Sequence, residues 1–254
     1  LLDQLGESFG FDGLVEFTIE AGRPDSITRE KLETIKEFPV TRISVNPQTM
    51  NQDTLEIIGR RHTVAQTIEA FHLARELNYN NINMDLIVGL PGEDISKVKY
   101  TLEKVKELSP DSLTVHSLAV KRAARLNMFK DKYQEMTFEN NQEIMDLTQQ
   151  TAYSMEMGPY YLYRQKNMAG NFENVGYAVA GLECIYNILI MEEKQTIIAC
   201  GAGASTKVVF HNEGDENHSV RIERIENVKD VRSYVERIDE MIERKRKFFG
   251  ENEF

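Results

Sequence analysis

One aspartate stands inside an otherwise apolar run of this sequence. The run is "NINMDLIVGLPGED", residues 81–94, where Asp85 precedes a Gly-Leu-Pro-Gly turn. A carboxylate in such a run is either a satisfied core group or an acceptor for the hydrogen bonds of a ligand. Taken alone, a single polar residue of this kind is more often a satisfied core group.

Polar residues recur in all four β-rich runs of the first half of the chain. In chain order they are Glu16 and Glu20, Asn46 and Gln48, Asn83 and Asp85, and Thr114, His116 and Ser117. Ligands of parallel α/β folds bind at the carboxyl ends of the strands. One shared polar cavity therefore explains the set better than separate buried groups on four successive strands.

The residue types in this set indicate a zwitterionic, hydroxylated ligand. Carboxylates and amides accept hydrogen bonds from ribose hydroxyls or from an amino group. Arg60, in "LEIIGRRHT", offers two parallel hydrogen bonds to a ligand carboxylate. A solvated helix end is an equally weighted alternative for Arg60 and Arg61.

The elements that must position these residues alternate along the chain. The β-rich runs cover 14–21, 41–48, 81–90 and 111–120, and helical patterns separate them. Two helices are expected to start after Thr28 and after His62, and a third to end at Ser109 before a proline. The alternation predicts parallel strands joined by crossover helices, as in a barrel or an open doubly wound sheet.

A different, mixed pattern follows residue 120. It predicts a helix over 138–157, the strand "YYLYRQ", a loop over 167–187, a strand pair around "QTIIACGAGASTKVVF" and a final helix over 228–249. Tyr160, Tyr161, Tyr163 and Arg164 are candidates to line a tetrapyrrole pocket, and an ordinary edge strand explains them equally well.

Composition narrows the class of protein. The chain has 254 residues and a formal net charge of -11, which repels phosphate backbones, so we expect no nucleic-acid partner. No apolar run reaches the roughly 18–20 residues that span a bilayer, and no signal peptide opens the chain. Two cysteines are too few for a disulfide framework. We therefore expect a cytoplasmic protein without a membrane span.

The motifs together resemble the middle of the radical S-adenosylmethionine enzymes of the oxygen-independent coproporphyrinogen III oxidase group. They are "EFTIEAGRP", "RISVNPQTMNQDTLEIIGRRHT", "NINMDLIVGLPGED" and "SPDSLTVHSLAV", with "GLECIYN" and "IIACGAGAST" later in the chain. The resemblance implies that five residues contact S-adenosylmethionine: Glu20, Gln48, Arg60, Asp85 and Ala119. It places Asp85 and Gln48 near the ribose and Arg60 near the carboxylate, and Ala119 contributes backbone.

The same resemblance implies the fold. We expect an α/β protein in which residues 1–125 form the C-terminal portion of a radical SAM (βα) barrel with parallel strands. Residues 126–254 are expected to form a smaller α+β C-terminal region of the coproporphyrinogen oxidase type.

The sequence also departs from the family pattern. The family binds a [4Fe–4S] cluster on a Cys-x3-Cys-x2-Cys motif and follows it with a glycine-rich strand end, and this sequence contains neither. Cys184 and Cys200 cannot supply three closely spaced thiolates, so we expect no metal ligand in this chain. Leu182 stands where the family usually has histidine. Since the sequence starts without methionine, we expect an N-terminal truncation.

The function implied is the oxidative decarboxylation of coproporphyrinogen III to protoporphyrinogen IX without oxygen. S-adenosylmethionine and the cluster would be the cofactors, a tetrapyrrole the substrate, and an electron donor the partner. The catalytic residues stay unidentified, and the chain alone is expected to be inactive. Two alternatives remain: a haem-binding chaperone-like relative, and an adenosyl-ligand module without turnover.

Overall fold

The computed structural model describes residues 1–119, 138–164, 169–211 and 220–251. They form two compact units, Leu1–Ile185 and Tyr186–Phe254. The predicted boundary between residues 125 and 126 lies outside the described residues. In the part of the chain that the structure covers, no helix combines the length and apolar character needed to cross a bilayer.

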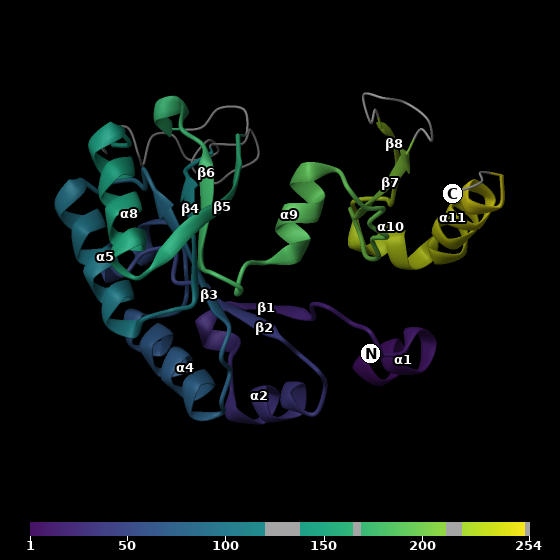
Figure 1. Cartoon of the computed structure of the whole chain (residues 1–254), viewed down its shortest axis with the longest axis horizontal. Coiled ribbons are helices and arrows are strands. Elements are labelled where there is room, and N and C mark those ends of the chain that lie inside the picture. Colours follow the sequence, from purple (N-terminus) through teal and green to yellow (C-terminus); the bar gives the residue numbers. More distant parts are fainter. Residues whose placement is uncertain (120–137, 165–168, 212–219, 252–254) are drawn as a thin grey trace. The chain divides into compact units, whose positions relative to one another are not determined.

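A six-stranded sheet forms the centre of the first unit (Figure 1). Its strands are β1 (Thr18–Gly22), β2 (Arg42–Val45), β3 (Ile82–Val88), β4 (Ser112–Ser117), β5 (Met157–Tyr163) and β6 (Asn174–Val179). The order is β1-β2-β3-β4-β6-β5; β1 to β4 are parallel, while β6 is antiparallel to both β4 and β5. The predicted parallel α/β arrangement is confirmed.

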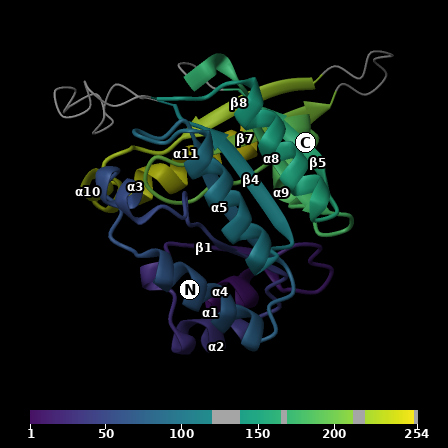
Figure 2. The same ribbon diagram turned by 90° about the vertical axis from the view of Figure 1, so that its left-hand side faces the viewer.

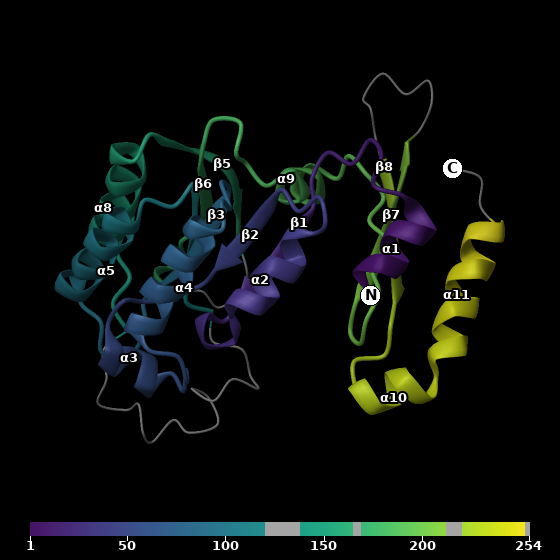
Figure 3. The same ribbon diagram turned by 90° about the horizontal axis from the view of Figure 1, so that it is seen from below.

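Helices precede and connect the strands of this unit. They are α1 (Leu2–Phe9), α2 (Arg29–Lys36), α3 (Gln52–Ile57), α4 (Val64–Glu76), α5 (Ile95–Leu108) and α8 (Gln142–Ser154), with short 3-10 turns η1 (Pro24–Ser26) and η2 (Ala169–Asn171). Figures 2 and 3 show α4, α5 and α8 along one face of the sheet. Leu32, Phe71, Leu102 and Ile144 from this helical layer join the buried core with the strands.

Side-chain caps explain where the crossover helices begin. Thr28 accepts a hydrogen bond from the backbone N–H of Lys31, and Thr63 forms a reciprocal capping box with Gln66. The Asp94 carboxylate accepts from two backbone N–H groups at the start of α5. Ser109 ends α5 in the left-handed conformation, as the proline that follows requires a stop. The predicted helix starts and stop are therefore right to within about one residue.

One predicted loop is wrong in the first unit. Residues 167–187 contain β6, whose glycine concealed the strand pattern. A Cβ atom at Gly176 would lie 1.9 Å from the ring of Tyr161, so only glycine lets the neighbouring tyrosine cross this strand. The requirement for glycine is tertiary and is invisible in the local sequence.

The second unit contains a two-stranded antiparallel sheet and three helices among its described residues. Its elements are α9 (Ile185–Glu192, which begins at the last residue of the first unit), β7 (Ser205–His211), β8 (Val220–Glu226), α10 (Val231–Glu236) and α11 (Ile238–Glu251). The strand that pairs with β7 along its length is β8, and the predicted pairing within 195–210 is limited to one antiparallel bridge between Ile197 and Lys207. The predicted final helix over 228–249 is divided at Arg237.

Candidate functional site at the carboxyl ends of the strands

The two faces of the parallel sheet carry different side chains. In β3, Ile82, Met84, Leu86 and Val88 are buried against the helical layer. Alternation therefore directs Asn83 and Asp85 to the opposite face. Their side chains meet there, because Asn83 Nδ2 donates to Asp85 Oδ1 at 2.7 Å.

Neighbouring strands extend this polar face. Ser112 and Thr114 of β4 donate hydrogen bonds to Asn83 Oδ1 at 3.1 and 3.3 Å. On β2, Ser44 stands beside Asn83 in the register of the sheet. These contacts join three strands into one polar surface whose middle is tightly hydrogen-bonded.

Asp85 is neither a fully satisfied core group nor a freely solvated one. Its carboxylate accepts one hydrogen bond from Asn83 and lies 3.8 Å from His116 Nε2, and its side chain is 21% exposed. The remaining lone pairs on Asp85 are therefore available to an incoming donor. This exposure fits the ligand-acceptor interpretation better than the core-group alternative.

Gln48, 37 residues before Asp85 in the sequence, forms a parallel bridge with Leu86, the residue that follows Asp85. Its backbone N–H donates to the Asp85 carbonyl at 3.0 Å, and its own carbonyl accepts from Ile87 N–H at 2.9 Å. The residue has φ of 69°, a left-handed conformation uncommon for a residue with a side chain. Within the described residues, the Gln48 side-chain amide has no hydrogen-bond partner.

Glu20 of β1 lies on the same face of the sheet, next to Ser44 of β2. Its carboxylate accepts from Ser44 Oγ at 2.6 Å and lies 3.9 Å from a guanidinium nitrogen of the buried Arg42. Its side chain is 64% exposed. Ser44 and Arg42 thus orient a carboxylate that is otherwise open to solvent.

Arg60 lies near the carboxyl edge of β1. Burial and the nearby Arg23 lower its pKa, while the attraction of Asp25 opposes them. Arg23 follows β1 directly, and the Asp25 carboxylate pairs with Arg23 rather than with Arg60. Among the described residues Arg60 has no carboxylate within ion-pair distance. A half-buried guanidinium in this state suits an anionic ligand.

Ala119 follows β4 and is partly buried. The preceding residue, Leu118, donates its N–H to the Val88 carbonyl at 2.9 Å, so the chain still runs beside β3 at this level. The structure therefore places Ala119 on the same edge as Gln48 and Asp85. Glu20, Gln48, Asp85 and Ala119 come from four adjacent parallel segments.

Tyr161 also reaches the polar face. Its ring covers Gly176 of β6, which pairs with Thr114 of β4. Burial raises the pKa of the Tyr161 phenol, with Thr114 as its hydrogen-bond partner and Asp85 close enough to add to the effect. Tyr163 stacks on Tyr161 with ring centroids 6.2 Å apart. The tyrosines of β5 therefore lie next to the candidate site.

Two members of the predicted polar set have other roles. The Glu16 carboxylate accepts from Ile185 N–H at 2.5 Å and from Cys184 Sγ at 3.4 Å, so it anchors the start of α9. Ser117 points away from the polar face, where its hydroxyl accepts from Asn140 Nδ2 at 3.1 Å. Both are structural contacts rather than ligand contacts.

Sequence reasoning missed some of the residues that support the site. Arg42 and Ser44, absent from the predicted polar set, orient Glu20, whereas Asn83 was in that set and links Asp85 to β4. The alternation of side chains within "RISV" and "INMD" could have revealed these supporting residues, because it puts them on one face of the sheet with Asp85 and Glu20.

The residues present fit an adenosyl amino acid and do not fit an iron–sulfur cluster. The polar edge offers carboxylate and amide acceptors and one guanidinium; in addition, Asn46 Oδ1 is buried without a partner in the described structure. The cysteines Cys184 and Cys200 lie in different units. In the described part of the chain, no three His, Cys, Asp or Glu side chains are grouped so that they could hold a metal ion.

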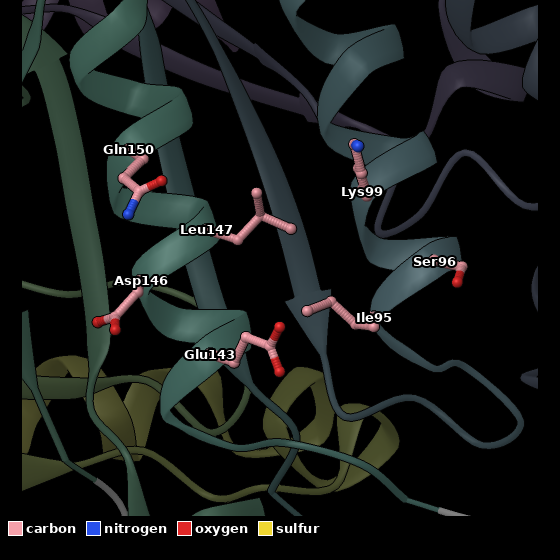
Figure 4. A pocket seen from close by; sticks show the side chains of 7 residues that line it. All are labelled: Ile95, Ser96, Lys99, Glu143, Asp146, Leu147 and Gln150. Carbon is pink, nitrogen blue, oxygen red and sulfur yellow. The ribbon is translucent and has the colours of Figure 1, made fainter.

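A groove of about 570 Å³ lies elsewhere, between α5 and α8 (Figure 4). Ile95, Ser96 and Lys99 line it from α5, and Glu143, Asp146, Leu147 and Gln150 line it from α8. It belongs to the helical layer and shares no residue with the strand ends. Since ligands of parallel α/β folds bind at strand ends, we assign the site to the polar edge and not to this groove.

Known proteins share this fold and these segments. Residues 9–105 match the family model described as "Radical SAM superfamily". "Oxygen-independent coproporphyrinogen-III oxidase-like protein HemZ" of Bacillus subtilis is 47% identical over 235 residues, which are 92% of this chain and 45% of that protein. "Heme chaperone HemW" of the same organism is 31% identical over 193 residues, which are 75% of this chain and 47% of that protein.

A solved structure supports the fold. Coproporphyrinogen III oxidase (HemN) from Escherichia coli superimposes with a TM-score of 0.66 at 19% identity, over 94% of this chain and 52% of that one. This chain spans about half the length of these relatives.

The six-stranded sheet and its helices form an α/β domain with the fold of the HemN structure, and residues 9–105 form a radical SAM domain. The chain is similar to the oxygen-independent coproporphyrinogen III oxidase-like proteins.

Proposed function

We propose that this chain is the part of an oxygen-independent coproporphyrinogen III oxidase-like enzyme that binds the adenosyl portion of S-adenosylmethionine. The observation that carries the proposal is the backbone hydrogen bond from Gln48 to Asp85, which joins the segment after β2 to the strand that bears a partly exposed carboxylate. Asp85 and Gln48 would accept from the ribose hydroxyls, and Arg60 would hold the ligand carboxylate.

The remaining predicted contacts complete this arrangement. Glu20, oriented by Ser44, would accept from the ligand's amino group, and Ala119 would offer backbone beside the base. When bound, S-adenosylmethionine would supply the radical that takes a hydrogen atom from a substrate propionate, which then loses CO2 and one electron to become a vinyl group. The electron released by the substrate needs an acceptor, the cluster would need an electron donor, and we include that donor as a partner, together with a cytoplasmic location, in the proposal.

The cluster that starts this chemistry has no ligand set in this chain, which holds two cysteines in total. Anaerobic reconstitution of the chain with iron and sulfide should therefore give no stoichiometric cluster absorbance. Binding of about four irons per chain would contradict this expectation.

An anaerobic activity assay tests the proposed decarboxylation. Protein expressed from the whole gene should convert coproporphyrinogen III to protoporphyrinogen IX anaerobically, with S-adenosylmethionine and a reductant. Binding of S-adenosylmethionine without any turnover would favour an adenosyl-ligand module instead.

A haem-binding function is the second candidate, because "Heme chaperone HemW" shares 31% identity over 193 residues. Spectral titrations with haem and with coproporphyrin distinguish the haem-binding function from the proposed decarboxylation. Stoichiometric haem binding without decarboxylation would favour the chaperone-like function.

A further inference from the structure

A buried carboxyl group connects the segments that follow β2 and β3. Glu93 is only 2% exposed, and its Oε1 accepts from Thr49 Oγ1 at 2.6 Å and from Asn51 Nδ2 at 3.1 Å. Thr101 of α5 is 3.1 Å from Thr49 Oγ1 and accepts from the Met50 N–H. The segment 49–51 is thus fixed to the segment that leads into α5.

The fixed segment begins one residue after Gln48. On the other side of Gln48, the carbonyl of Pro47 accepts from Nε2 of the buried His62 at 3.2 Å. Burial lowers the pKa of His62, which keeps the imidazole neutral and leaves Nε2 as the donor. Both neighbours of Gln48 are therefore held by buried side chains from elsewhere in the chain.

The contacts on either side of Gln48 restrain a residue whose backbone conformation is unfavourable by itself. Gln48 has φ of 69°, and left-handed backbone is unfavourable at a non-glycine residue. Such a conformation persists only where surrounding contacts determine it. The same conformation lets Gln48 exchange backbone hydrogen bonds with Asp85 and Ile87.

We propose that Glu93 is a positioning residue for the adenosyl-ligand site: through Thr49 and Asn51 it holds the turn at Gln48 in the conformation in which the Gln48 backbone pairs with Asp85 and Ile87. Glu93 touches no ligand in this proposal. The ligand part of the inference rests on the proposed function, whereas the restraint on the turn can be measured without ligand.

The variants at position 93 differ in the hydrogen bonds that their side chains can accept. Both donors reach the same oxygen of Glu93, so Glu93→Gln can keep both bonds through its amide oxygen. Glu93→Met keeps a buried side chain of similar length but has no comparable acceptor. Thr49 and Asn51 retain Thr101 as a neighbour in that variant, which limits the loss of folding. Glu103→Ala, an exposed carboxylate on α5, is the matched control.

Amide hydrogen exchange of the ligand-free protein measures the turn. In Glu93→Met, the amides of Gln48 and Ile87 should exchange about tenfold faster, the factor equivalent to one buried hydrogen bond. The amide of Val115, in the middle of the sheet, should be unchanged. Glu93→Gln and Glu103→Ala should both retain the parental rates at Gln48 and Ile87.

Calorimetric titration with S-adenosylmethionine, using protein from the whole gene, measures the effect of each substitution on ligand affinity. Affinity should fall about tenfold in Glu93→Met and stay parental in Glu93→Gln and Glu103→Ala. Parental exchange and affinity in Glu93→Met would overturn the inference. Faster exchange with parental affinity would overturn the positioning role.

Failure of the proposed function gives a different result. If the parental protein binds no S-adenosylmethionine, the proposed function and the ligand part of this inference both fall. The exchange rates then still decide whether Glu93 holds the turn. A uniform increase of exchange at Gln48, Ile87 and Val115 would mean general destabilisation and would overturn the inference.

Discussion

The two faces of the six-stranded sheet differ in what their side chains contact. Toward the helices, Leu86, Met84 and Leu113 are almost completely buried and belong to one apolar core. On the other face, Asp85 and Glu20 are partly exposed and only partly paired. Adjacent residues of one strand thus serve different purposes, so stability and binding should be separable by single substitutions.

Leu86→Ala should have the largest effect. It removes a buried side chain from the helix-facing side and leaves a cavity, which costs about 2–5 kcal/mol of the free energy of unfolding. Urea denaturation measures the loss. Leu162→Ala, at an exposed position of β5, is the control and should change stability by less than about 0.5 kcal/mol. Equal losses for the two variants would contradict the assignment of the faces.

Asp85→Asn tests the other face at the neighbouring position. The amide keeps the shape but offers one acceptor oxygen, so we expect S-adenosylmethionine binding to weaken by about 1.5–3 kcal/mol in protein from the whole gene. The melting temperature should change little. Equilibrium binding and thermal unfolding of the same variant provide the check. Parental affinity with a markedly lower melting temperature would make Asp85 a structural residue.

Glu93→Gln should change how stability depends on pH. Burial raises the pKa of Glu93, so the folded protein holds this proton more tightly than the unfolded chain. Parental stability should therefore fall, relative to Glu93→Gln, as pH rises from the ordinary glutamate pKa through the raised value. One group contributes a slope of at most about 1.4 kcal/mol per pH unit.

Denaturation curves of both proteins, measured at several pH values on either side of that window, give this difference. Parallel stability profiles across the whole range would show that Glu93 has the same proton affinity in the folded and unfolded states.

The smallest effect is expected from Asp53→Asn. Asp53 pairs with Lys97 at 2.5 Å on the outer surface, and the hydrogen bond to Lys97 lowers the pKa of Asp53. Exposed pairs of this kind contribute about 0.2–1 kcal/mol and are screened by salt. Stability should fall by no more than that, and less at high salt. A larger loss would mean that this pair supports the segment that carries Gln48.

Sequence patterns were sufficient for much of the first unit. Alternating β-rich runs and helix caps at Thr28 and Thr63 were readable because both depend on neighbours in the sequence. The same patterns failed for β6, where Gly176 is required by the ring of Tyr161 from another strand. The second unit was harder still, since β7 pairs with β8, a strand that the sequence patterns had not predicted.

For the candidate site too, some features can be read from the local sequence and others only from the tertiary structure. The sequence by itself determined that acceptors recur on four strands, because the two-residue period of a strand is a local property that residue types reveal. Only the tertiary structure decided that Gln48 contacts Asp85, that Glu16 instead anchors α9, and that Glu93 restrains the turn. These outcomes depend on strand register and on hydrogen bonds between segments distant in the sequence, and no local pattern encodes either.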